Sequence, residues 1–124
     1  MRKIFLSIHN TQVAIIGGGP SGLLLSHILH LNGIESIIVE RHSKSHGIVR
    51  IRAGVFEAGT VQLLRDVGLS KRMDKEGIPH DGTSIAWEGK PSLFIDVKKY
   101  TGKSFMAYGQ TSITEDLFKQ REID

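Results

Sequence analysis

Cysteine is absent from the 124 residues, and there are only three prolines and one tryptophan. Without cysteine the chain forms no disulfide, no thiolate metal site and no cysteine nucleophile. No apolar run reaches the roughly 20 residues that a membrane-spanning helix needs, and the apolar part of residues 1–8 is too short for a signal peptide. These absences favour a cytoplasmic protein that contacts no membrane.

A large excess of charge is also missing. Sixteen Lys and Arg against 13 Asp and Glu give a formal net charge of +3. The basic residues are scattered and are not interleaved with aromatic residues, so the sequence gives no indication of nucleic-acid binding. The length suits one small domain with a real core, and it is short for a whole two-substrate redox enzyme.

Glycine, by contrast, is plentiful, and residues 17–22 read Gly-Gly-Gly-Pro-Ser-Gly, which matches the pattern G-x-G-x-x-G. The residues around it predict a strand at 12–16, a helix at 23–31 and a second strand at 37–39. Strand, glycine turn, helix, strand and then Glu40, in this order, predict a Rossmann-like βαβ unit that binds a dinucleotide. A glycine-rich turn in an ordinary α/β fold is the alternative.

Each position in this motif has a physical role. Gly17 allows a tight turn, Gly19 lets a pyrophosphate approach the backbone, and Gly22 lets the helix pack closely on the strands. The free N–H groups and the dipole at the start of the helix favour an anion. Glu40 lies where the motif places an acidic residue that accepts hydrogen bonds from a ribose diol.

The next stretch, residues 41–49, is polar and predicts a loop. Its two histidines and a serine, His42, His46 and Ser43, are types found in metal sites. A solvated loop is the favoured interpretation, because no carboxylate or third ligand is evident.

A pair of arginines follows, within Arg50-Ile51-Arg52-Ala53-Gly54-Val55. Because the planar guanidinium fork suits phosphate oxygens, Arg50 and Arg52 predict a second anion clamp just before a helix. Two surface arginines that solvate a loop are the alternative. The phosphate motif upstream favours the functional interpretation.

Local signals predict further elements in the second half of the chain. The helix after residue 55 ends at Gly68, and its buried face is predicted to be Phe56, Thr60, Leu63, Leu64 and Val67. The later elements are a helical turn at 70–76, a hairpin of 83–87 with 93–97, a strand at 105–108 and a last helix from Ser112. Ser112 and Glu115 match a capping box at the start of that helix.

The predicted sheet is incomplete. Two or three parallel strands and a hairpin leave strand edges open, and a dinucleotide-binding fold needs more strands to cover its core. Residues 11–124 are therefore expected to be the N-terminal portion of a larger domain, preceded by a tail at residues 1–10.

Three stretches together are specific enough to identify a family. Residues 13–25, residues 50–55 and Tyr108-Gly109-Gln110-Thr111 resemble the class A flavoprotein aromatic hydroxylases, most closely those acting on 4-hydroxybenzoate. The resemblance covers the chain from about Thr11 onward. It implies an α/β fold: a Rossmann-like FAD-binding βαβ unit with an added β-hairpin, forming the incomplete N-terminal part of a larger FAD/NAD(P)-binding fold.

The resemblance implies FAD as the dinucleotide. Its pyrophosphate would lie over the glycine loop with Ser21 beside it, and Glu40 would hold the adenosine ribose. Residues 50–55 would line the flavin, and Gln110 would reach the ribityl-diphosphate region.

The resemblance also implies a reaction in which NAD(P)H and O2 convert 4-hydroxybenzoate to 3,4-dihydroxybenzoate. Arg41, Arg50 and Arg52 match arginines that the family associates with the reduced nicotinamide cofactor. His42 and His46 depart from the best-known pattern and leave the choice of NADH or NADPH open. The family's substrate-binding residues lie beyond this length, so no catalytic residue and no metal ligand is assigned. A homodimer of the full-length protein is compatible with the resemblance.

Two other functions remain open. An NAD(P)-dependent dehydrogenase shares the βαβ start, but it needs neither residues 50–55 nor the Gly-Gln-Thr turn. A truncated remnant that binds flavin without catalysis would also leave sheet edges open. The favoured interpretation is the FAD-binding part of a monooxygenase, inactive by itself.

Overall fold

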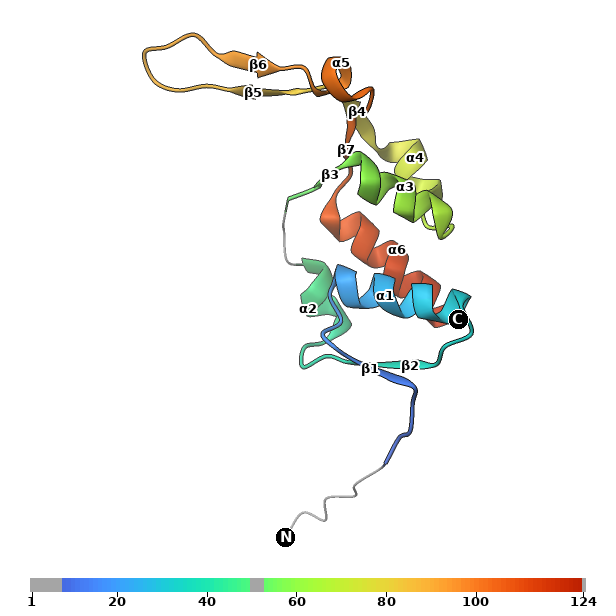
Figure 1. Ribbon diagram of the computed structural model, residues 1–124. Helices are drawn as coiled ribbons and strands as arrows, with labels where there is room; N and C mark the ends of the chain where they lie inside the picture. The colour runs from blue at the N-terminus through green and yellow to red at the C-terminus, as the bar shows by residue number, and fades with distance from the viewer. Residues whose placement is uncertain (1–7, 50–52, 124) are drawn as a thin grey trace.

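The computed structural model describes residues 8–49 and 53–123 (Figure 1). Its first unit is a βαβ motif in which β1 (Val13–Ile16) and β2 (Ser36–Val39) pair in parallel, with Val13 opposite Ser36. Helix α1 (Pro20–Leu31) connects them and covers one face of the pair. This is the strand–helix–strand order that the glycine motif predicts, with Pro20 in the first helical turn.

The signals at the end of α1 also act as predicted. Gly33 has a φ of +70°, and its N–H donates to the carbonyl of His30 at 2.9 Å. A glycine in this left-handed conformation stops a helix without strain. The chain then enters β2, where Ile38 packs toward the core and Ile37 and Val39 lie exposed.

The core lies between helices rather than between sheet layers. Helix α6 (Gln110–Ile123) packs against α1, and α3 (Ala58–Asp66) and α4 (Lys71–Glu76) lie beyond it (Figure 1). The buried residues of this cluster come from all four helices and the turns that join them: Leu23, Val61, Leu64, Leu69, Met73, Tyr108, Ile113 and Leu117.

Two small antiparallel sheets complete the structure. In the first, β7 (Phe105–Ala107) is the centre strand between β3 (Val55–Phe56) and β4 (Ile78–His80). The second is a hairpin of β5 (Thr83–Ile85) and β6 (Leu93–Ile95), which projects from the rest of the chain and is followed by α5 (Val97–Thr101) (Figure 1). The predicted hairpin of 83–87 with 93–97 and the predicted strand at 105–108 are confirmed with shorter strands, whereas β3 and β4 are too short to have been recognised from the sequence.

The prediction of a loop at residues 41–49 is wrong in part, because α2 (Lys44–Val49) is helical. Gly47 lowers the helix propensity of this stretch, so the sequence favours a loop. The helix is supported from outside: the Lys44 ammonium pairs with the Glu122 carboxylate and lies 5.3 Å from the centre of the Phe118 ring. Contacts with α6 therefore override the local preference.

Two predictions in the second half of the chain also need correction. The prediction for α3 is right for Leu64, and Phe56 and Val67 pack partly buried against the core. It is wrong for Thr60 and Leu63, which are exposed, and it omitted the buried Val61. Helix α6 begins at Gln110, so Ser112 lies inside the first turn and does not cap it. Glu115 pairs instead with Arg72 of α4.

Several apolar side chains remain open to solvent. On the face of the β1–β2 pair turned away from α1, Ile16 is 84% exposed and Val39 is 54% exposed. The hairpin exposes Leu93 and Phe94 in the same way. No helix in the described part of the chain is both long and apolar enough to cross a membrane.

Candidate cofactor site

The glycine turn has the geometry that its sequence predicts. Gly17 adopts a φ of +110°, which L side chains rarely adopt, and its N–H donates to the carbonyl of Val39 at 2.9 Å. A Cβ on Gly22 would lie 2.0 Å from the carbonyl oxygen of Gly17 and 3.3 Å from Ile15. Glycine at 17 therefore permits the turn, and glycine at 22 permits the close approach of α1 to β1.

The start of α1 is open toward a ligand. A Cβ on Gly19 would meet no atom within 4 Å, so the backbone there faces free space. Gly19 is the N-cap of α1, and no side chain caps the helix. The first N–H groups of a helix carry partial positive charge and bind anions when they lack a capping side chain. Ser21 lies exposed in this first turn.

Glu40 closes the turn from the end of β2. Its Oε2 accepts from the N–H of Gly18 at 2.9 Å, and its Oε1 accepts from the N–H of His42 at 2.9 Å. The hydrogen bond from Gly18, followed by that from His42, holds the pKa of this carboxyl below its ordinary value. The group is therefore a carboxylate at neutral pH. Each oxygen can accept a further hydrogen bond, as a ribose diol would require.

A pocket of about 220 Å³ lies in front of this turn. It brings together three stretches that are distant in sequence: the glycine loop, the segment after β2 and one face of α6. The lining residues are Gly18, Gly19, Pro20, Glu40, Arg41, His42, Ser43, Gly47, Gln110, Thr114 and Phe118. Four residues predicted for the cofactor, Gly19, Glu40, Arg41 and Gln110, therefore share one pocket.

Sequence reasoning missed Thr114 and Phe118 in this pocket. Together with Gln110 they are spaced by four residues, which places them on one face of α6. The spacing was visible in the sequence, but the expected start of the helix at Ser112 hid it. The Thr114 hydroxyl donates to the Gln110 carbonyl at 2.7 Å, one turn earlier in the same helix.

Polar side chains form the outer wall of the pocket. Nε of Arg41 donates to Nε2 of His42 at 2.9 Å, which holds the guanidinium beside the end of β2. No group of three His, Asp or Glu side chains within the described ranges is placed to hold a metal ion. The Arg41 guanidinium in this wall offers a cation that can pair with a phosphate.

The stretch at 50–55 is described only in part. Arg50, Ile51 and Arg52, the predicted anion clamp and its central residue, lie outside the described residues. Ala53 is exposed, and Val55 pairs with Ala107 in the antiparallel sheet.

Gly54 joins this stretch to the Tyr-Gly-Gln-Thr turn. Its carbonyl accepts from the N–H of Tyr108 at 2.8 Å, and a Cβ on Gly54 would lie 2.9 Å from the Cα of Gly109. Two motifs more than fifty residues apart in the sequence therefore touch through their backbones, immediately before Gln110.

Taken together, these residues can bind an anion and a hydroxyl group. An uncapped helix start, a guanidinium and a carboxylate suit a diphosphate joined to a ribose. The pocket at the glycine loop is smaller than the 300–1,000 Å³ typical of sites that enclose a whole small molecule. It therefore fits part of a dinucleotide.

Comparison with known proteins agrees with this chemistry. A family model described as "FAD binding domain" matches residues 10–124. The chain is 43% identical over 113 residues to the p-hydroxybenzoate hydroxylase of Acinetobacter baylyi, covering 90% of this chain and 28% of that protein. It is 28% identical over 75 residues to the phenol 2-monooxygenase of a Pseudomonas species, covering 60% of this chain and 12% of that protein. The chain thus spans less than a third of either relative.

Solved structures show the same fold. The chain superimposes on a probable FAD-dependent monooxygenase from Pseudomonas aeruginosa, PqsL, with a TM-score of 0.78, 15% identity, and coverage of 92% of this chain and 30% of that one. For the p-nitrophenol 4-monooxygenase PnpA from Pseudomonas putida the TM-score is 0.76 at 18% identity, with coverage of 89% and 29%. At these identities the similarity concerns the fold alone.

Proposed function

Because this chain belongs to the FAD-binding domain family, we propose that it forms the N-terminal, cofactor-holding part of a monooxygenase that hydroxylates 4-hydroxybenzoate. The observation that carries the proposal is the convergence of the glycine loop, Glu40 and Gln110 on one pocket. FAD is the dinucleotide that this family binds. The product would be 3,4-dihydroxybenzoate, with NAD(P)H and O2 as co-substrates.

In this proposal, different residues hold different parts of FAD. Gly17, Gly19, Ser21 and Gly22 form the turn and helix start that hold the pyrophosphate, and Glu40 holds the ribose of the adenosine. Gln110, which lines the same pocket, would contact the linker between the diphosphate and the flavin.

The remaining assignments rest on the resemblance and on the 43% identity to the Acinetobacter protein. In this proposal the segment Arg50, Ile51, Arg52, Ala53, Gly54 and Val55 lines the flavin. Arg41, Arg50 and Arg52 would attract the anionic nicotinamide cofactor, because guanidinium groups pair well with phosphate. FAD, when bound, supplies the chemistry by which two electrons and O2 place one oxygen atom on the aromatic ring. We also propose a cytoplasmic location, which cell fractionation would test.

A chimera tests the proposal. Residues 11–124 replace the matching N-terminal segment of the Acinetobacter baylyi hydroxylase, and product is followed by chromatography with FAD, NAD(P)H and 4-hydroxybenzoate. We expect 3,4-dihydroxybenzoate at a rate coupled to NAD(P)H consumption. The unaltered Acinetobacter protein serves as the positive control, and the chimera with Glu88→Ala, a change in the exposed hairpin loop, controls for handling.

A chimera that folds and retains FAD but forms no product would contradict the proposed role in hydroxylation. A chimera that binds NAD in place of FAD would favour the dehydrogenase interpretation.

A further inference from the structure

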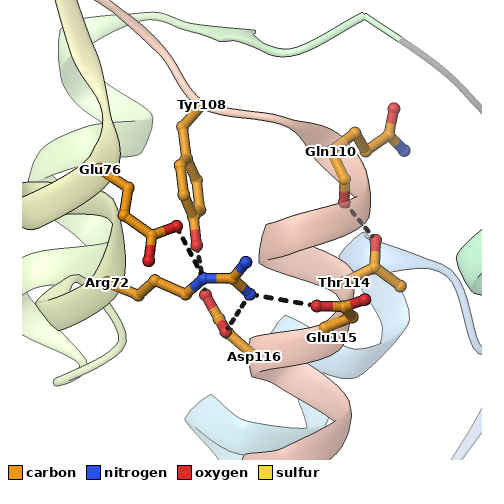
Figure 2. A network of polar contacts seen from close by, with 7 residues as sticks. All are labelled: Arg72, Glu76, Tyr108, Gln110, Thr114, Glu115 and Asp116. Atoms are coloured by element: carbon orange, nitrogen blue, oxygen red, sulfur yellow. Dashed lines mark hydrogen bonds and ion pairs between the residues drawn. The ribbon is translucent and has the colours of Figure 1, made fainter.

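A cluster of polar side chains joins α4 to α6 on the side away from the pocket (Figure 2). Arg72 of α4 is its centre. Its Nε donates to the Glu76 carboxylate at 2.9 Å, and its Nη1 donates to Glu115 at 3.1 Å and to Asp116 at 3.3 Å. The guanidinium thus ties α4 to α6 through two carboxylates, those of Glu115 and Asp116, and also pairs with Glu76 of its own helix.

Tyr108 extends this cluster toward the cofactor turn. Its hydroxyl donates to Oδ2 of Asp116 at 2.6 Å, and the side chain is only 4% exposed. Its backbone N–H donates to Gly54. Tyr108 is therefore fixed at both ends, with its side chain held by α6 and its backbone by the segment that precedes β3.

The hydrogen bond from Tyr108 to Asp116 affects the pocket through the geometry of α6. A helix turns by about 100° per residue, so Asp116 lies roughly 200° around the axis from Thr114 and from Phe118. Fixing Asp116 on one side therefore fixes the rotation of α6 and the direction of its opposite face. Figure 2 shows the Gln110 amide directed away from Arg72 and Asp116.

We propose that Tyr108, Asp116 and Arg72 are positioning residues for the cofactor. They set the rotation of α6 and the place of the Gly109–Gln110 turn, so that Gln110 faces the pocket. The inference rests on the proposed function, since the ligand that Gln110 meets is FAD. Burial raises the pKa of Tyr108, as does its hydrogen bond to Asp116, so the phenol remains a neutral donor at physiological pH.

The test compares two substitutions in the 124-residue chain, each of which weakens one side-chain interaction. Tyr108→Phe removes the hydrogen bond to Asp116 and keeps the buried ring. Asp74→Asn is the matched control, because it weakens the Arg65–Asp74 ion pair, which joins α3 to α4 at 2.6 Å and does not touch α6. We expect Tyr108→Phe to weaken FAD binding about tenfold and the control to change it less than about twofold.

A double-mutant cycle separates positioning from general stability. If Tyr108 acts through Gln110, the variant Tyr108→Phe/Gln110→Ala should bind FAD no more weakly than Gln110→Ala alone. Additive losses in the cycle would overturn the proposal. Asp116→Asn, which keeps an acceptor for the tyrosine but removes the charge, replaces Tyr108→Phe if that variant does not fold.

Amide hydrogen exchange without FAD gives an answer that does not depend on the cofactor. The N–H of residue 108 should exchange faster in Tyr108→Phe than in the parent or in Asp74→Asn, because its bond to Gly54 is no longer held in place. Unchanged exchange at this N–H would overturn the positioning role. Failure of the parent chain to bind FAD, with faster exchange in Tyr108→Phe, would instead contradict the proposed function alone.

Discussion

At the scale of single residues, the shape of the pocket depends on the hydrogen bonds that Glu40 accepts from two backbone N–H groups. Its carboxylate accepts from Gly18 in the glycine loop and from His42 after β2, and so fixes the two walls of the pocket to each other. The same carboxylate keeps acceptor positions free for a ligand hydroxyl. Glu40 therefore shapes the turn, and in the proposed function it also binds the ribose.

We predict that Glu40→Ala weakens FAD binding by roughly 10- to 100-fold, because a charged acceptor for a hydroxyl typically contributes about 1.5–3 kcal/mol. Glu88→Ala, in the exposed hairpin loop, removes the same charge without touching the pocket. Fluorescence titration of both variants measures the effect. If Glu40→Ala and Glu88→Ala have equal dissociation constants for FAD, Glu40 is a solvated residue at the end of β2 that does not bind the cofactor.

The second prediction concerns how the stabilisation by Tyr108 depends on pH. Its folded-state pKa lies above the ordinary value of 10.0, mainly through burial. The stabilisation that it gives is therefore complete below pH 10 and declines as the pH rises toward the folded-state pKa. Relative to Tyr108→Phe, the parent should lose about 1 kcal/mol of unfolding free energy between about pH 10 and 11.

Urea unfolding of both proteins at several alkaline pH values measures this difference. The exposed Tyr100 and the lysines are common to both chains and cancel in the comparison. A difference that does not change with pH would mean that Tyr108 ionises in the folded chain as it does when unfolded.

At the scale of elements, the packing of α1 on β1 is the feature most sensitive to a small change. We predict that Gly22→Ala destabilises the chain by about 1–3 kcal/mol, because its methyl group would collide with the Gly17 carbonyl and force α1 away from the strand. Gly59→Ala in α3 is the matched control. Its methyl group would meet no atom within 4 Å, and alanine favours a helix.

Thermal or urea unfolding compares the two variants. Gly22→Ala should be less stable than the parent, and Gly59→Ala equally or more stable. Equal stability of all three chains would mean that α1 can shift outward without cost.

The elements also show what the sequence could predict. Strand β1, helix α1 and strand β2 follow from contiguous local signals, and the resemblance predicted the family, the α/β fold and FAD, which the matched family model and the structural neighbours confirm. Helix α2 was missed because it is stabilised by contacts of Lys44 with Glu122 and Phe118 of α6, which no local pattern contains.

The pocket itself was predictable only on one side. The glycine loop and Glu40 carry a motif with fixed spacing, whereas Thr114 and Phe118 enter only once α6 is known to begin at Gln110. The hydrogen bond from Tyr108 to Asp116 joins residues eight apart in the sequence, and Arg72 contacts Asp116 from another helix. Such contacts depend on tertiary packing.

At the scale of the whole molecule, the chain leaves apolar side chains exposed and covers only part of the length of its relatives. Ile16 and Val39 on the β1–β2 pair and Phe94 on the hairpin lie open. The chain covers 28% of the Acinetobacter hydroxylase. Hydroxylation needs the phenol held close to the reactive group and shielded from water, and the pocket at the glycine loop is built for phosphate and ribose.

We therefore predict that the 124-residue chain, supplied with FAD, NAD(P)H and 4-hydroxybenzoate, forms no 3,4-dihydroxybenzoate. Chromatography of the reaction mixture provides the measurement, with the Acinetobacter hydroxylase as the positive control. Product formed in proportion to NAD(P)H consumption would show that these residues alone complete the active site.

The central claim, that this chain binds FAD through its adenosine diphosphate, is tested most directly by titration with FAD, FMN and NAD under identical conditions. FMN lacks the adenosine and would lose its contacts with Glu40 and part of those with the glycine loop. NAD keeps the adenosine diphosphate but lacks the ribityl chain and flavin that Gln110 is proposed to meet. We predict that FAD binds at least about tenfold more tightly than FMN or NAD, a difference of about 1.4 kcal/mol or more. FMN binding as tight as that of FAD would contradict the account.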